Sequence, residues 1–242
     1  MRAERAEEAR ATMLDLFPEG FEEVERAGGV ELAAYTNAAG EERLWQVFGG
    51  ASASDVEADW DIRWRAFHRP IRLGELWVGP PWETPDADAT AVVVDPGRAF
   101  GTGAHPTTRL CLELLLESER GSLLDVGCGS GVLSIAAALV GFGPVTAVDV
   151  EEASVAATLE NAAANGVPVA ARRVAADEQL GSADVAVANI SLDAVRNLPE
   201  RLEARVLVTS GYLASEEPEL AGYRRVERSL RDGWVADLHR RA

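Results

Sequence analysis

The chain has 242 residues, 47% of them hydrophobic, and carries a formal net charge of −17. This length allows one large domain or an ordinary domain with a small one, and the composition is that of a globular protein. The charge argues against direct binding of nucleic acid, which needs clustered cations, and two Cys are too few for a disulfide framework.

The first 58 residues predict a small α+β unit. Apolar residues at helical spacing predict a helix over residues 4–17. Two strand-like pieces follow, Phe21–Arg26 and Val30–Thr36, and the Gly28-Gly29 pair between them is typical of a hairpin turn. Residues 41–48 fit either a helix or a strand.

Residues 59–89 predict a connection between this unit and the rest of the chain. The stretch Gly49–Asp55 has the composition of a flexible segment. A short helix from Val56 to Phe67 then carries Trp60 and Trp64 on one face, a spacing typical of core packing. The strand-like Leu76–Val78 precedes a Pro-rich stretch.

Residues 90–242 alternate between strand and helix. This pattern predicts an α/β fold with a parallel sheet covered by helices on both faces. Sheets of this kind bind ligands at the carboxyl ends of their strands, so we expect the chemistry there. The predicted strands are Ala91–Val94, Ser122–Val126, Val145–Val148, Val169–Val174, Val185–Ala188 and Val206–Ser210, and the predicted helices are Thr107–Glu117, Gly131–Val140, Ser154–Asn165 and one beginning at Leu192.

A Gly-rich turn follows the strand that ends at Val126. It reads Asp125-Val-Gly127-Cys-Gly129-Ser-Gly131 and opens a helix, so its glycines let a ligand approach backbone N–H groups closely. A dinucleotide fingerprint would need Gly where the chain has Val132. The carboxylate of Asp125 suits a ligand with a cationic amino group better than a pyrophosphate, and S-adenosylmethionine has such a group. A tight turn without a ligand is the alternative.

Asp149 ends the next predicted strand. An acid at this place can accept hydrogen bonds from both ribose hydroxyls of a nucleoside. A solvated Asp at a strand end is the alternative, but the combination with the Gly-rich turn favours nucleoside binding.

Two further features lie where a substrate would react. Asn189 follows a strand, and its amide oxygen can accept an N–H bond and aim an amine; a turn-capping Asn is the alternative. The loop Phe100-Gly-Thr-Gly-Ala-His105-Pro-Thr107-Thr108 offers His105 as a base or an orienting group, although a structural histidine explains it equally. We expect Thr107 to cap the following helix.

These stretches together resemble the bacterial ribosomal protein L11 methyltransferase (PrmA) family. The resemblance runs from about Trp60 to Trp234 and is densest at 92–137 and 184–190. It rests on the segment Asp95–Thr108, the segment Leu124–Ala136 and Val187-Ala-Asn-Ile190. Most methyltransferases of this class share the Gly-rich turn, whereas the F-G-T-G-x-H-x-T-T loop is far more specific.

The resemblance implies a Rossmann-like class I methyltransferase sheet over residues 90–242 and S-adenosylmethionine as cofactor. It implies N-methylation of lysine side chains and the N-terminal amine of a basic ribosomal protein, which the acidic charge fits. It also implies a reduced ferredoxin-like unit at 1–58 for substrate recognition. The expected catalytic residues are Asn189 and His105, and the expected cofactor contacts are Thr108, Gly127, Asp149, Asn189, Asp125, Gly129, Gly131, Phe100, Gly101 and Thr107.

The chain also departs from the family pattern. The family's first unit opens with a strand, whereas this chain begins in the predicted helix, and residues 1–58 otherwise match poorly. After Asn189 the family usually has Leu and Ala, where this chain has Ile190, Ser191 and Leu192. The usual Pro-Gly-Gly before the late strand is replaced by Arg201-Leu-Glu-Ala-Arg205. These departures leave the substrate more open than the cofactor.

Other functions remain open at this point. They are methylation of another protein, such as an electron-transfer flavoprotein subunit, methylation of a small-molecule amine, and cofactor binding without catalysis; a nicotinamide oxidoreductase is disfavoured by Val132. No apolar run approaches the ~20 residues of a membrane span, and the first ten residues lack the apolar core of a signal peptide. We expect a cytoplasmic monomer with no metal site and no membrane or nucleic-acid partner.

Overall fold

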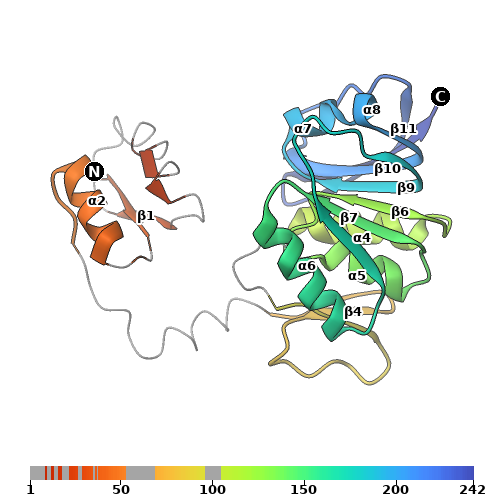
Figure 1. Cartoon of the computed structure of the whole chain (residues 1–242), viewed down its shortest axis with the longest axis horizontal. Helices are drawn as coiled ribbons and strands as arrows, with labels where there is room; N and C mark the ends of the chain where they lie inside the picture. Colours follow the sequence, from red (N-terminus) through yellow and green to blue (C-terminus); the bar gives the residue numbers. More distant parts are fainter. Residues whose placement is uncertain are drawn as a thin grey trace. The chain divides into compact units, whose positions relative to one another are not determined.

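The computed structural model describes residues 9, 12–13, 16–17, 22–26, 29–34, 36, 38–52, 69–95 and 105–242. The chain divides into two compact units, residues 1–61 and 62–242 (Figure 1). The predicted helix from Val56 to Phe67 lies outside the described residues, as do Phe100 and Gly101.

The first unit contains a hairpin and a helix. Strands β1 (Glu22–Arg26) and β2 (Gly29–Ala33) pair antiparallel with Arg26 opposite Gly29, which confirms the predicted hairpin but places Gly29 in the second strand instead of the turn. The ambiguous segment is a helix, α2 (Ala38–Phe48). Positions 9, 13 and 17, four residues apart, are all buried, as one face of the predicted first helix requires.

A seven-stranded sheet forms the centre of the second unit. Its order is β11-β12-β10-β9-β6-β7-β8, and the strands from β10 to β8 are parallel. The chain leaves β6 towards β7 on one side and returns to β9 on the other, so β6 and β9 flank the switch point where such sheets bind ligands. The strands are β6 (Leu123–Val126), β7 (Val145–Asp149), β8 (Val169–Arg173), β9 (Gly181–Asn189), β10 (Leu202–Leu213), β11 (Tyr223–Arg231) and β12 (Trp234–Arg241).

Helices cover both faces of this sheet, as predicted. Successive strand residues point to opposite faces, so Leu123 packs in one buried cluster and Leu124 in the other. The first cluster joins the sheet to α4 (Pro106–Glu117), α5 (Val132–Leu139) and α6 (Glu152–Ala164). The second joins it to α7 (Leu192–Arg196) and α8 (Leu198–Arg201).

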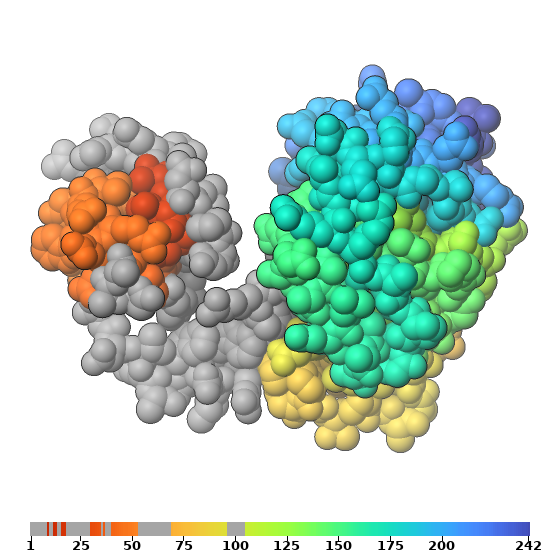
Figure 2. All heavy atoms as spheres, in the orientation of Figure 1, coloured from red at the N-terminus to blue at the C-terminus, as the bar shows by residue number. Residues whose placement is uncertain are grey.

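A three-stranded sheet caps one end of this unit. It consists of β3 (Ile71–Leu73), β4 (Leu76–Gly79) and β5 (Thr90–Val93), and its apolar residues belong to the same buried cluster as α4 and α5. In the space-filling view this segment, in yellow, lies at the opposite end of the unit from the C-terminal strands, in blue (Figure 2).

The expectation of an all-parallel sheet was wrong at one edge. Strand β12 runs antiparallel to both β10 and β11, and neither β11 nor β12 was predicted. The two join through Asp232 and Gly233, which have φ angles of 51° and 82°. Asp-Gly is a strong hairpin signal, but the five Arg and Glu residues of β11 hide the alternation that identifies a strand.

None of the helices in the described part of the chain has the length and apolar character that a membrane crossing requires.

Candidate active site

The Gly-rich turn between β6 and α5 has a backbone that only glycine adopts easily. Gly127, Gly129 and Gly131 have φ angles of 76°, 53° and 82°. Space is also short, because a Cβ on Gly127 would lie 2.3 Å from Cγ2 of Ile190, and one on Gly131 would lie 2.9 Å from Cγ2 of Thr158. Residues 127 and 131 therefore require glycine, both for their φ angles and for the lack of space for a Cβ. Helix α5 begins directly after Gly131.

Asp149 locks this turn to the end of β7. Its Oδ2 accepts a hydrogen bond from Gly129 N at 3.0 Å, and its Oδ1 accepts one from Glu151 N at 3.0 Å. A carboxylate has about four lone-pair positions, so each oxygen keeps capacity for a further donor. The structure thus brings together two of the predicted cofactor residues, Asp149 and Gly129.

Asp125 lies beneath the turn as a buried carboxyl group. It is 1% exposed, and its Oδ2 accepts a hydrogen bond from Ser134 Oγ at 2.6 Å. Its Oδ1 is buried with no hydrogen-bond partner among the described residues. Burial raises the pKa of Asp125 to about 6, although the Ser134 bonds oppose this. A buried oxygen left without a donor suits a ligand that brings one.

Asn189 and Thr108 meet at the same edge of the sheet. Val126 pairs with Val148 on one side and with Ala188 on the other, so the residues that follow, Gly127, Asp149 and Asn189, lie at one edge. Asn189 Nδ2 donates to Thr108 Oγ1 at 3.4 Å, and Thr108 is buried in the first turns of α4. The amide oxygen of Asn189 is then the atom that can accept an N–H bond.

Ile190 packs closely against two glycines, one in the Gly-rich turn and one on β10. Its side chain fills the space beside Gly127, and its backbone lies against Gly211, where a Cβ would be 2.0 Å from the Ile190 carbonyl oxygen. Ile190 N also donates to Ser210 O at 3.1 Å. Sequence reasoning missed Gly211, whose φ of 102° marks it as a position for glycine.

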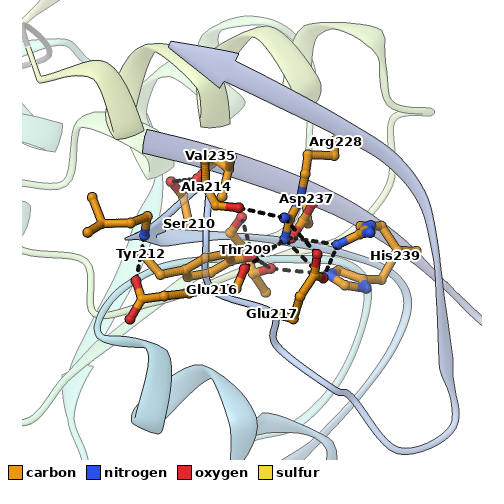
Figure 3. Close-up of polar contacts among 12 residues, drawn as sticks. Thr209, Ser210, Tyr212, Ala214, Glu216, Glu217, Arg228, Val235, Asp237 and His239 are labelled. Atoms are coloured by element: carbon orange, nitrogen blue, oxygen red, sulfur yellow. Dashed lines mark hydrogen bonds and ion pairs between the residues drawn. The ribbon is translucent and has the colours of Figure 1, made fainter. Parts of the chain in front are cut away.

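A buried polar network supports β10 around Gly211 (Figure 3). Arg228 makes two bonds to the fully buried Asp237, with Nε to Oδ1 at 2.8 Å and Nη2 to Oδ2 at 2.7 Å. Tyr212 donates to Asp237 Oδ2 at 2.9 Å, and its hydroxyl lies 2.7 Å from Thr209 Oγ1. Asp237 thus links Arg228 to Tyr212, on the strand that bulges at Gly211.

His239 closes this network without adding charge. Its Nε2 lies 3.2 Å from Thr209 Oγ1, and burial lowers the pKa of His239 to about 4, so the ring is neutral at pH 7. The network lies behind the site and has a structural role. Nothing in the sequence analysis singled out its members.

His105 caps α4, and the prediction that Thr107 is the cap was wrong. The helix begins at Pro106, and His105 Nδ1 accepts a hydrogen bond from Thr107 N at 3.4 Å and lies 2.7 Å from Thr107 Oγ1. The His105 ring packs edge-to-face on Trp234 with centroids 5.1 Å apart. Burial lowers the pKa of His105, which favours the neutral form of the ring. Proline at the first helical position moves the cap one residue earlier than the Thr pattern suggests.

Within the described ranges, no three His, Cys, Asp or Glu side chains are grouped as a metal site. The two Cys are free and buried, and burial raises the pKa of the Cys128 thiol in the Gly-rich turn to about 12. A thiol with this pKa stays protonated and unreactive at neutral pH.

The family model and the curated relatives that match this chain carry the same family name. The family model "Ribosomal protein L11 methyltransferase (PrmA)" matches residues 26–236. The match begins well before Trp60, where the sequence resemblance was expected to start, so it includes part of the first unit. The L11 methyltransferase of Methylococcus capsulatus is 41% identical over 230 residues, covering 86% of this chain and 76% of that protein. That of Pseudomonas putida is 39% identical over 209 residues, covering 76% of this chain and 69% of that protein.

A solved structure shares the architecture as well. The crystal structure of the ribosomal protein L11 methylase from Lactobacillus delbrueckii subsp. bulgaricus superposes with a TM-score of 0.64 and 28% identity, covering 72% of this chain and 99% of that one. The strand order, the Gly-rich turn and these matches agree, and the chain belongs to the ribosomal protein L11 methyltransferase (PrmA) family.

Proposed function

We propose that this chain transfers the methyl group of S-adenosylmethionine to amines of ribosomal protein L11, at lysine side chains, the N-terminal amine or both. The observation that carries the proposal is the family match over residues 26–236. The relatives from Methylococcus capsulatus and Pseudomonas putida bear the name of this activity. The formal net charge of −17 favours attraction of a basic protein substrate.

The described residues fit S-adenosylmethionine on a feature of their own. The buried Oδ1 of Asp125 has no donor among the described residues, and the amino group of the methionine part is a donor of the opposite charge. Asp149 keeps acceptor capacity for ribose hydroxyls while it holds Gly129. We assign cofactor binding to Asp125, Gly127, Gly129, Gly131, Asp149, Thr108 and Asn189, together with Phe100, Gly101 and Thr107 from the sequence pattern.

Asn189 would orient the substrate amine. When bound, S-adenosylmethionine supplies a methyl group on a positively charged sulfur, and the amine nitrogen accepts it. Because Nδ2 of Asn189 donates to Thr108, its Oδ1 can accept an N–H bond and aim the nitrogen lone pair. Holding the reacting atoms in line is the main contribution that such a site makes to the rate.

The amine must lose a proton before transfer, because a lysine has a reference pKa near 10.4. His105 accepts a hydrogen bond at Nδ1, so the neutral ring carries its proton on Nε2. In this tautomer Nε2 is a hydrogen-bond donor, which suits a role of His105 in orienting a group. The proton then passes to water, because a backbone carbonyl accepts hydrogen bonds but is far too weak a base to take a proton from an ammonium group.

The activity is tested with purified L11 and S-adenosylmethionine labelled at the methyl group. The full chain is expected to label L11, and mass spectrometry of the product locates the label on lysine or N-terminal nitrogen. We assign substrate recognition to residues 1–58, so a chain lacking the first unit should bind S-adenosylhomocysteine but leave L11 unlabelled. No label on L11 from a full chain that binds S-adenosylhomocysteine would overturn the assignment of the substrate.

A further inference from the structure

One face of α6 carries three polar side chains that point into the protein. Thr158, Asn161 and Asn165 are three and four residues apart, so they form a single row along the helix. Thr158 is fully buried and Asn161 is 6% exposed. Buried amide and hydroxyl groups need hydrogen-bond partners, and the partners of this row lie on two other segments.

The first half of the row binds the Gly-rich turn. Thr158 Oγ1 donates to Gly129 O at 3.0 Å, and Asn161 Nδ2 donates to Ser130 O at 2.9 Å. Two successive carbonyl groups of the turn are thus held by side chains of α6. These bonds fix peptide groups next to glycines that have wide backbone freedom.

Asn165 and Asn161 also bind the backbone at the C-terminal end of β5 and just after it. Asn165 Oδ1 accepts from Val93 N at 2.8 Å, and its Nδ2 donates to Val93 O at 2.6 Å and to Asn161 O at 2.8 Å. Asn161 reaches one step further along this strand, since its Oδ1 accepts from Asp95 N at 3.0 Å and its Nδ2 donates to Asp95 O at 3.3 Å.

Asn161 is therefore the one member of the row that bonds both segments. Its amide connects Ser130, in the turn, with Asp95, the first residue of the segment Asp95–Thr108 that carries part of the family resemblance. Asn165, the C-cap of α6, has the same side chain one turn later, but it bonds β5 and α6 and not the Gly-rich turn.

We propose that Asn161 is a positioning residue that holds the Gly-rich turn in its cofactor-binding conformation by tying it to Asp95. The inference rests on the proposed use of that turn to bind S-adenosylmethionine. A turn with three left-handed glycines loses much backbone entropy when it becomes ordered. Hydrogen bonds that order it in the free protein raise cofactor affinity, because binding no longer has to supply that ordering.

The test compares Asn161→Ala with Asn165→Ala in the full chain. Each change removes the same amide and three of the hydrogen bonds given above, so the two variants are matched in chemistry. Both are expected to lower the midpoint of thermal unfolding. Only Asn161→Ala should raise the Kd for S-adenosylhomocysteine, by about tenfold in calorimetry, while Asn165→Ala changes it less than about twofold.

The kinetic constants KM and kcat should also distinguish Asn161→Ala from Asn165→Ala. In Asn161→Ala the KM for S-adenosylmethionine rises with the Kd, and kcat at saturating cofactor stays within about threefold of the wild-type value. A general loss of structure would reduce the active fraction in both variants and leave KM unchanged.

Thr158→Val is a second variant that tests the α6 row if Asn161→Ala does not fold. It keeps the side-chain volume and removes the bond to Gly129 O, so the Kd for S-adenosylhomocysteine should rise about threefold or more. Equal Kd values in the two asparagine variants, or an unchanged Kd in Thr158→Val, would overturn the role of the α6 row. A wild-type chain that binds no S-adenosylhomocysteine would refute the cofactor assignment itself, and this inference with it.

Discussion

Replacing Asp125 with asparagine tests whether the buried carboxyl group is kept for a ligand. The folded protein raises the pKa of Asp125 from 3.8 to about 6, chiefly by burial. A raised pKa means that the folded state binds the proton more tightly than the unfolded chain. The ligand-free protein therefore has the full contribution of this group below pH 4 and loses it as pH rises through 6.

The magnitude follows from the two pKa values. Each pKa unit is worth about 1.4 kcal/mol, so the ionised carboxylate costs about 2 to 3 kcal/mol more at pH 8 than at pH 4. The amide of the Asp125→Asn variant does not titrate, and whatever it costs in this place is the same at both pH values. The difference in unfolding free energy between wild type and Asp125→Asn should therefore change by about 2 to 3 kcal/mol over this range, to the disadvantage of the wild type at pH 8.

Ligand binding should show the opposite preference. A cationic amino group favours the carboxylate, so wild-type affinity for S-adenosylhomocysteine should fall as pH drops below about 6, whereas Asp125→Asn should bind about 10- to 100-fold more weakly at pH 8 without that pH dependence. Methylthioadenosine, which lacks the amino group, is the matched control and should bind both proteins alike. Parallel pH curves for the two proteins, in unfolding and in binding, would refute this account of Asp125.

Three further changes probe the site and its support. Asp149→Ala should raise the Kd for S-adenosylhomocysteine about 10- to 100-fold, and unchanged affinity in calorimetry would remove Asp149 from the site. Asn189→Ala should lower kcat on L11 more than tenfold while the cofactor Kd stays within about threefold; normal turnover would leave it only its bond to Thr108. Arg228→Met leaves the buried Asp237 with the longer contact to Arg225, at 3.7 Å, and should cost about 3 kcal/mol of unfolding free energy in urea, with much of it recovered by adding Asp237→Leu. A loss below about 1 kcal/mol would contradict the structural role of the pair.

The sequence predicted the centre of the fold because buried parallel strands leave a clear pattern. Val145–Val148 and Val185–Ala188 are short apolar runs that end at a polar residue, and the structure extends them to Asp149 and Asn189. The same reading placed Asp125, Asp149 and Asn189 at strand ends. Parallel strands in one sheet then bring these ends to one edge.

The features that sequence reasoning missed depend on contacts between distant elements. The row on α6 resembles an ordinary polar helix surface, and nothing in the spacing of Thr158 and Asn161 shows that carbonyl groups of another segment lie opposite them. Ile190 resembles any apolar residue after a strand, yet it determines that residues 127 and 211 are glycine. Periodicity reports which face is buried and does not report what that face touches.

The position of β12 determines when this sheet can be completed during synthesis. Strand β11 leaves the ribosome before β12, yet in the sheet β12 lies between β11 and β10. Until β12 emerges, β11 has no neighbour in the sheet and Arg228 has no Asp237 to bind. The edge of β10 stays open for the same time, and an open edge can pair with another chain. An incompletely folded chain is therefore exposed to mispairing at the edge of β10 until β12 has joined the sheet.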